Sequence, residues 1–286
     1  MMSPEQLRDY YIEACDVELR AFKPGNVSIY ADGHDMTVED FRISAKVSAE
    51  PLCNRNYSLG EKIYYAVKAT REAVGCNTNL GIILLCAPLI EAAYLIDVNV
   101  SLRQALYRVL INTTVSDADW TFKAIALASP AGLGDSERYD VHESATVTLT
   151  EAMAFASNKD RIALQYLTDY KDIFDFSCLT YYNAMNKWGI RDWAAVAVYT
   201  DLLRCFPDSH IVRKYGDQCS EMVAAKMALL HTELSNSKSP EMLMPLLHSI
   251  DRELKSRGVN PGTTADMTVA TVLTVFLEEA TKRSSS

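Results

Sequence analysis

The sequence has 286 residues, of which 49% are hydrophobic and 23% are charged, as is typical of a globular protein with a substantial buried core. The formal net charge of -9 argues against a general affinity for nucleic-acid backbones or anionic membranes, because both need an excess of Lys and Arg. Any phosphate-binding site must therefore be a local basic pocket.

The spacing of apolar residues predicts an all-α fold. The first helix begins at Ser3-Pro4-Glu5-Gln6, with Ser as N-cap, Pro at the first helical position and Gln as the reciprocal capping residue, and it ends before Lys23. Thr37 and Ser58 are expected to cap the next two helices. The helical period continues in eight further segments, 102–110, 120–127, 149–156, 162–170, 193–203, 222–230, 242–254 and 269–277.

No pair of alternating β-branched segments joined by a two-residue turn is present, so no strand is predicted. No linker divides the chain, and we expect a single compact multi-helical domain over residues 1–282, followed by a disordered tail at 283–286.

The most apolar segment, residues 80–97, is interrupted by Pro88 and Glu91, which favours a buried core helix over a membrane span. The N-terminus has no basic region followed by an apolar run, and thus no secretory signal is expected. The seven cysteines are scattered and form no CxxC pair, which indicates reduced thiols. Together these features predict a cytoplasmic protein.

Five short polar segments could carry chemistry, because loops are few in this chain and polar residues in them stand out. They are residues 23–27, 32–36, 75–81, 208–216 and 260–266.

In the second segment, Asp32-Gly33-His34-Asp35 could hold a divalent cation or provide a general base, since cations such as Mg²⁺ prefer carboxylate oxygens and His titrates near neutral pH. The alternative is a polar loop with an Asx-turn.

In the third segment, Asn77, Thr78 and Asn79 stand between Gly75 and Gly81 at the start of the apolar helix. The free N–H groups and positive dipole end of a helix suit a phosphate group. Ordinary helix capping by Asn or Thr is the competing interpretation.

Lys23 and Lys214 are candidate phosphate contacts, and Gly25 and Gly262 are small enough for the backbone to approach a ligand. Asp266 falls in the first turn of the last predicted helix, where it is either a ligand of a metal or ribose or a residue that stabilises the helix dipole. Solvated surface charges are the alternative for the two lysines.

In this order the segments resemble the triphosphoribosyl-dephospho-CoA synthase family. The matching pieces are Lys23-Pro24-Gly25-x-Val27, His34-x-Met36, Gly75-x-Asn77-Thr78-x-x-Gly81-Ile82 and Pro261-Gly262-x-x-Ala265-Asp266. The resemblance implies an all-α fold and transfer of the triphosphoribosyl group of ATP to the ribose 2′-hydroxyl of dephospho-CoA, with adenine leaving and Mg²⁺ accompanying the triphosphate.

For such a reaction, Asp35 or Asp266 is expected to bind Mg²⁺ or act as the base, and His34 is the alternative base. Lys23 and Lys214 would contact phosphates. Phosphate or ribose oxygens would be bound at Asn77, Thr78 and Asn79, with Gly25, Gly81 and Gly262 beside the substrate. Glu91, outside these motifs, is expected to be dispensable for ligand binding.

The sequence departs from the family at Asn79, where the family usually has His after Asn-Thr. This departure makes the sequence similar to a divergent branch of the family, which is encoded among tetrahydromethanopterin- and methanofuran-linked one-carbon genes. The similarity also includes Leu133-Gly134, Asp140-Val141 and residues 160–166 and 208–210. Two alternatives therefore stay open. One is a transferase of cofactor biosynthesis that acts on a different phosphorylated substrate, and the other is a non-catalytic nucleotide-binding protein. The oligomeric state is not predicted.

Overall fold

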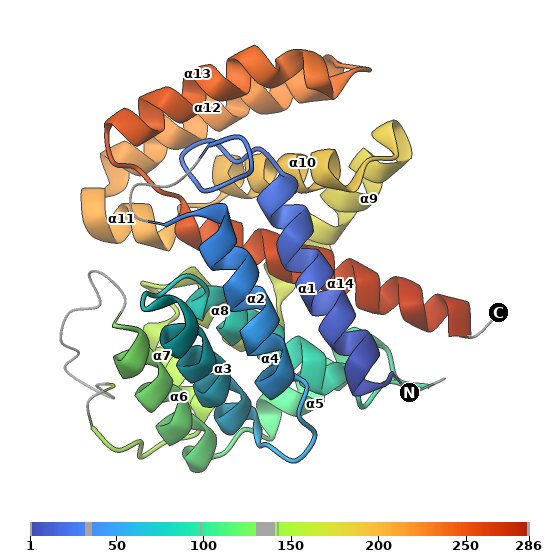
Figure 1. The fold of residues 1–286 in the computed structure, drawn as a ribbon, viewed down its shortest axis with the longest axis vertical. Helices are drawn as coiled ribbons and strands as arrows, with labels where there is room; N and C mark the ends of the chain where they lie inside the picture. The colour runs from blue at the N-terminus through green and yellow to red at the C-terminus, as the bar shows by residue number, and fades with distance from the viewer. Residues whose placement is uncertain (1, 32–35, 98, 130–140, 142, 285–286) are drawn as a thin grey trace. The chain divides into compact units, whose positions relative to one another are not determined.

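The computed structural model describes residues 2–31, 36–97, 99–129, 141 and 143–284, and within these ranges the chain is helical (Figure 1). The only β-type pairings among these residues are two isolated bridges, Ser28 with Ala31 and Asp97 with Val100. The all-α prediction is confirmed. The candidate residues His34 and Asp35 lie outside the described residues, as do 133–134 and Asp140.

The chain forms two compact units, each of which is described by itself. The first unit consists of residues 1–14, 39–171 and 273–286, and the second of residues 15–38 and 172–272. Helices α1 (Pro4–Arg20) and α14 (Gly262–Ser284) contribute residues to both. The single domain expected over residues 1–282 stays a prediction. Helix α14 includes the first two residues of the predicted tail, 283 and 284.

The first unit is built around the apolar helix α4 (Leu80–Ala93), in which all residues except Gly81 and Glu91 are buried. Helix α3 packs against α6, and α4 packs against α5. The remaining helices of this unit, besides parts of α1 and α14, are α2 (Val38–Leu52), α3 (Leu59–Val74), α5 (Leu102–Ile111), α6 (Val115–Ala128), α7 (Leu149–Ala156) and α8 (Arg161–Leu167).

Gly60 permits the close approach of α3 to α6. A Cβ atom at this position would lie 2.6 Å from both the Cα and the carbonyl oxygen of Asp117. The Asp117 carboxylate accepts a hydrogen bond from the Gly60 N–H at 2.9 Å. The two helices therefore meet through backbone, which only glycine allows at this distance.

The second unit has helix α10 (Arg191–Cys205) packed between α9 (Cys178–Trp188) and α12 (Asp217–Asn236). It also contains α11 (Ser209–Tyr215) and α13 (Met244–Ser256). A π-helical segment, Asp172–Ser177, leads into α9, and a 3₁₀ turn, Pro240–Leu243, leads into α13.

Helix boundaries follow local capping chemistry. Ser3 with Gln6 and Ser58 with Glu61 form the predicted reciprocal hydrogen bonds. Helix α6 starts five residues before the predicted position 120, because Thr114 and Asp117 form a capping box that the apolar period did not show.

Two predicted boundaries are wrong. The helix expected at 162–170 ends at Leu167, and Asp169 and Tyr170 have positive φ angles of 51° and 56°, which a helix cannot contain. Residues 208–216 were expected to form a polar loop, but Asp208 caps a short helix there, α11.

The structure also bears on the membrane-span and cysteine predictions. None of the helices in the described residues combines the length and apolarity needed to cross a membrane. None of the seven cysteines, all of which lie in the described residues, forms a disulfide, and four of them, Cys15, Cys53, Cys86 and Cys178, are buried.

Candidate functional site

Two motif loops from opposite ends of the sequence meet in the second unit. The side chain of Asn26 donates a hydrogen bond to the Asn260 side-chain oxygen at 2.7 Å, although the residues are 234 positions apart. Gly25 packs directly against Pro261. The structure therefore brings together segments 23–27 and 260–266, both of which the sequence analysis singled out.

Gly25 makes this contact possible. Its φ angle is +87°, and a Cβ atom would lie 3.0 Å from both Pro261 Cδ and the Val259 carbonyl oxygen. Its N–H donates to the Asp251 carboxylate at 2.8 Å, and the Tyr199 hydroxyl donates to the Pro24 carbonyl at 2.8 Å. The glycine is thus required by the packing of the two loops, which differs from the substrate contact expected for it.

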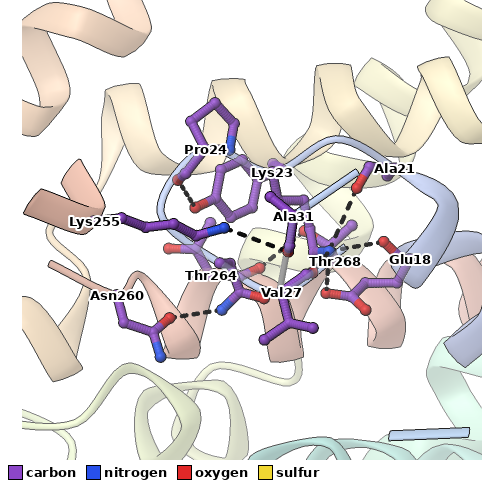
Figure 2. A network of polar contacts seen from close by, with 12 residues as sticks. Glu18, Ala21, Lys23, Pro24, Val27, Ala31, Lys255, Asn260, Thr264 and Thr268 are labelled. Atoms are coloured by element: carbon purple, nitrogen blue, oxygen red, sulfur yellow. Dashed lines mark hydrogen bonds and ion pairs between the residues drawn. The ribbon is translucent and has the colours of Figure 1, made fainter. Parts of the chain in front are cut away.

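Lys23 is fully buried and anchors its own loop (Figure 2). The ammonium group donates to the carbonyls of Glu18 at 2.9 Å and Val27 at 2.6 Å, and it pairs with the Glu18 carboxylate at 3.1 Å. A lysine has three donors, and these partners account for all of them. Lys23 therefore has a structural role, and this geometry does not support the phosphate contact expected for it.

Burial acts on both members of this ion pair. It lowers the pKa of the Lys23 ammonium and raises the pKa of the Glu18 carboxyl, because a low dielectric penalises each charged form. The mutual attraction and the carbonyl hydrogen bonds oppose that penalty. Removing either residue would therefore leave an unpaired buried charge, which lowers stability.

Asp208 joins a third polar segment, 208–216, to this loop cluster. One carboxylate oxygen accepts the N–H groups of His210 at 2.9 Å and Ile211 at 3.1 Å. The other accepts the Thr264 N–H at 2.8 Å and the Thr264 hydroxyl at 2.7 Å. A single buried carboxylate therefore caps both α11 and α14.

This double cap has an electrostatic consequence. Burial raises the pKa of Asp208, and the hydrogen bonds from Thr264 and Ile211 oppose the rise. The carboxylate stands at the first turn of α14, where an anionic ligand would otherwise find free N–H groups. Because Asp208 occupies the Thr264 N–H, side chains beside the two helices are the candidate contacts for a ligand phosphate.

Such side chains occur on the adjoining faces of α11 and α14. A Cβ atom at Gly262 would lie 3.7 Å from His210 Nδ1, so the histidine ring borders the first turn of α14. Asp266 follows Gly262 by four residues and Lys214 follows His210 by four, which places each pair on one helix face. His210, Lys214, Gly262 and Asp266 are hereafter called the α11–α14 face.

The groups of the α11–α14 face differ in exposure. Lys214 is exposed, whereas His210 and Asp266 are half-buried. Burial lowers the pKa of His210, as do the nearby Arg213 and Lys214, while the Asp208 charge opposes the shift. The Tyr215 hydroxyl donates to the Gly258 carbonyl at 2.6 Å and ties the end of α11 to the loop before α14.

The described residues contain no group of three or more His, Cys, Asp or Glu side chains close enough to hold a metal ion by themselves. A magnesium ion bound to a triphosphate usually takes only one or two carboxylates from the protein. Asp266 fits that smaller requirement, and Asp35, the other predicted ligand, lies outside the described residues.

The remaining predicted site residues belong to the first unit, and two of them, Thr78 and Asn79, join a buried network of neutral side chains. The Ser48 hydroxyl donates to the Ser44 carbonyl at 2.6 Å, so the Tyr11 hydroxyl, 2.9 Å away, must be the donor to Ser48. The Asn79 amide also donates to Ser48, at 3.3 Å, and the Thr78 hydroxyl donates to Ser44 Oγ at 2.6 Å.

These hydrogen bonds hold the start of α4. Thr78 and Asn79 are buried, and their side chains bind α2. The Asn77 side chain accepts the Leu80 N–H at 3.2 Å, which is the capping role that competed with ligand binding. Asn77 and Gly81 are only half-buried, so they are the more accessible members of this segment.

Glu91 has a structural partner, while its expected dispensability for ligand binding stays a prediction. It pairs with Lys62, whose side chain is only 1% exposed. Removing the charge of Glu91 would leave a buried ammonium without its carboxylate partner, so a different carboxylate must serve as a control.

Sequence reasoning did not assign roles to Asp208, His210 or Asp251. Asp208 could have been found, because Asp before a short amphipathic segment is a typical N-cap. Asp251 gives no such signal. It lies within α13, and its bond to the Gly25 N–H joins residues 226 positions apart.

The comparisons with known proteins agree with this fold. The family model described as CitG, ATP:dephospho-CoA triphosphoribosyl transferase, matches residues 4–285. A crystal structure from Archaeoglobus fulgidus, of a candidate triphosphoribosyl-dephospho-CoA synthase, matches with a TM-score of 0.64 and 22% identity, covering 83% of this chain and 97% of that one. No curated protein matches significantly.

The match over almost the entire chain defines the class of protein, which is a transferase with an all-α fold. The chain belongs to the CitG family of ATP:dephospho-CoA triphosphoribosyl transferases. The Archaeoglobus structure supports the fold alone, because its sequence identity to this chain is low.

Proposed function

We propose that this protein transfers the triphosphoribosyl group of ATP to the ribose 2′-hydroxyl of dephospho-CoA and releases adenine. The observation that carries the proposal is the family match over residues 4–285. The substrates named by the family are ATP and dephospho-CoA.

The second unit offers groups suited to the donor. The exposed ammonium of Lys214 is the candidate contact for phosphate oxygens, and Asp266 is the candidate ligand for magnesium. Bound magnesium would neutralise negative charge on the triphosphate. In the first unit, Asn77 and Gly81 keep their proposed substrate contacts, because they are more accessible than Thr78 and Asn79.

Transfer from a nucleotide needs stabilisation of an oxocarbenium-like sugar, as in other glycosyl transfers, together with a base for the incoming hydroxyl. Asp266, the carboxylate of the α11–α14 face, is the candidate group to stabilise the sugar. Lys23 and Gly25 are assigned to loop architecture, since the cluster occupies their polar groups.

The test is to incubate the purified protein with ATP, Mg²⁺ and dephospho-CoA, and to measure free adenine by chromatography and the product by mass spectrometry. We expect equimolar adenine and triphosphoribosyl-dephospho-CoA. Hydrolysis of ATP without adenine release, or no reaction, would contradict the proposal.

A different acceptor is the second candidate, and Asn79 is the observation that favours it. This residue is buried and its amide binds Ser48, so it offers no titratable group at a position where the family usually has one. Adenine release with a phosphorylated pterin or furan precursor, and none with dephospho-CoA, would support this candidate and the proposed association with one-carbon metabolism.

A further inference from the structure

His210 differs from the other described histidines in having an unused ring at the loop cluster. His231 Nδ1 lies 2.5 Å from the Asp201 carboxylate, and the His248 ring packs edge-on against Phe22 at 4.6 Å. Within the described part of the chain, neither ring nitrogen of His210 makes a hydrogen bond. Its ring nitrogens are therefore not committed to another group of the described residues.

The backbone around His210 is fixed on both sides. Asp208 accepts the His210 N–H at 2.9 Å and also caps α14, so the histidine is held in register with the first turn of that helix. Gly262 has no side chain beside the ring. A Cβ atom at this position would lie 3.7 Å from His210 Nδ1, which is an ordinary van der Waals distance.

The environment of His210 also favours its neutral form, which can accept a proton. Burial and the positive charges of Arg213 and Lys214 favour the neutral imidazole, and only Asp208 opposes them. Asp266 follows by one helical turn Gly262, whose Cβ position borders the His210 ring. A neutral imidazole near neutral pH has one nitrogen lone pair that can take a proton.

We propose that His210 is the general base that accepts the proton of the acceptor hydroxyl during transfer. This inference rests on the proposed function and adds a catalytic residue to it. The carboxylate and ammonium groups of the α11–α14 face, Asp266 and Lys214, would hold the donor beside the same ring.

The bond between the donor sugar C1 and the adenine nitrogen breaks, and adenine leaves with the bonding electron pair and takes up a proton from water. The acceptor oxygen forms the new bond to C1 and loses its proton to His210. The imidazolium then returns that proton to solvent, so no oxidant or further reactant is needed.

The experiment compares wild type, His210→Gln and His210→Ala in the adenine-release assay, with His231→Gln as the matched control from the same unit. General-base catalysis typically contributes about 10²- to 10⁴-fold, so we expect both His210 variants to lose at least about 10²-fold in kcat. KM for ATP should change little, and His231→Gln should retain wild-type kcat.

Two further measurements separate chemistry from folding. The melting temperature of each variant reports whether the fold survives, and imidazole added to His210→Ala should restore part of kcat, which a purely structural role would not allow. Wild-type kcat in both variants, or a loss that follows the melting temperature and is not rescued, overturns the assignment while the proposed function stands. Absence of adenine release by wild type with every acceptor overturns the proposed function and this inference with it.

Discussion

The two units hold their motif segments by different physical means. In the second unit, buried charged groups hold the motif segments in place. They are the Glu18–Lys23 pair, Asp208 and Asp251. In the first unit, the start of α4 is held by neutral hydroxyls and an amide. Charged anchors make stronger hydrogen bonds but are costly to leave unpaired, so the second unit should be the more sensitive of the two to loss of one partner.

The strongest test of this comparison is Lys23→Met. It leaves the Glu18 carboxylate buried without its counter-ion, and we expect it to lower the free energy of unfolding by about 3–5 kcal/mol, measured by urea denaturation. The double variant Glu18→Leu with Lys23→Met is the control, because it removes both charges and should recover much of that loss. Equal stability of Lys23→Met and wild type would contradict the charged-anchor account.

The next test concerns ligand binding at the second unit. A ligand at 100 times its Kd stabilises the folded state by about 2.7 kcal/mol, and we expect Asp266→Asn to lose the part of this stabilisation that depends on magnesium. Thermal unfolding with and without ATP and Mg²⁺ measures it. Glu233→Gln, an exposed carboxylate of α12, is the control and should keep the full response. If Asp266 only stabilises the helix dipole, its replacement costs about 1 kcal/mol at most and leaves the ligand response intact.

Gly25→Ala tests how closely the loops pack. The added Cβ would meet Pro261 and Val259 at 3.0 Å, so we expect a loss of about 1–3 kcal/mol from overpacking, in addition to the cost of its positive φ angle. Gly189→Ala isolates the second cost, because Gly189 has a φ angle of +67° with nothing within 4 Å of its Cβ position. Similar melting temperatures for the two variants would show that the Gly25 contact is unimportant.

The corresponding test in the first unit is Ser48→Ala. Loss of this hydroxyl leaves the Tyr11 hydroxyl and the Asn79 amide without their acceptor, which should cost about 1–3 kcal/mol. Since these groups are neutral, the loss should be nearly the same at pH 6 and pH 8. Ser116→Ala, at an exposed position of α6, should leave the unfolding free energy unchanged.

The smallest expected effect is a pH dependence of the unfolding free energy that arises from His210 in the second unit. The folded-state pKa of His210 is below its ordinary value of 6.5, so the unfolded chain binds more protons between the two values. Stability should therefore rise with pH through the window just below 6.5 and level off above it. His210→Asn should flatten this part of the profile relative to wild type, and an unchanged slope would show that His210 titrates normally.

Much of the fold could be predicted because helices are encoded locally. The apolar period located most of the helices, and the capping boxes at Ser3 and Ser58 placed two helix starts correctly. Asp169 and Tyr170 show the limit of this reasoning, since positive φ angles at residues other than glycine leave no trace in an apolar pattern.

The sequence by itself determined that the chain is helical, which polar segments interrupt the helices and which family its motifs resemble, because these properties depend on neighbouring residues and on their order. Only the tertiary structure decided which polar groups remain accessible. Lys23 and Lys214 are equivalent as sequence candidates, yet one is fully buried against Glu18 and the other is exposed. The physical reason is that burial and hydrogen-bond partners come from residues distant in the chain, such as Asp251 with Gly25 and Asp208 with Thr264.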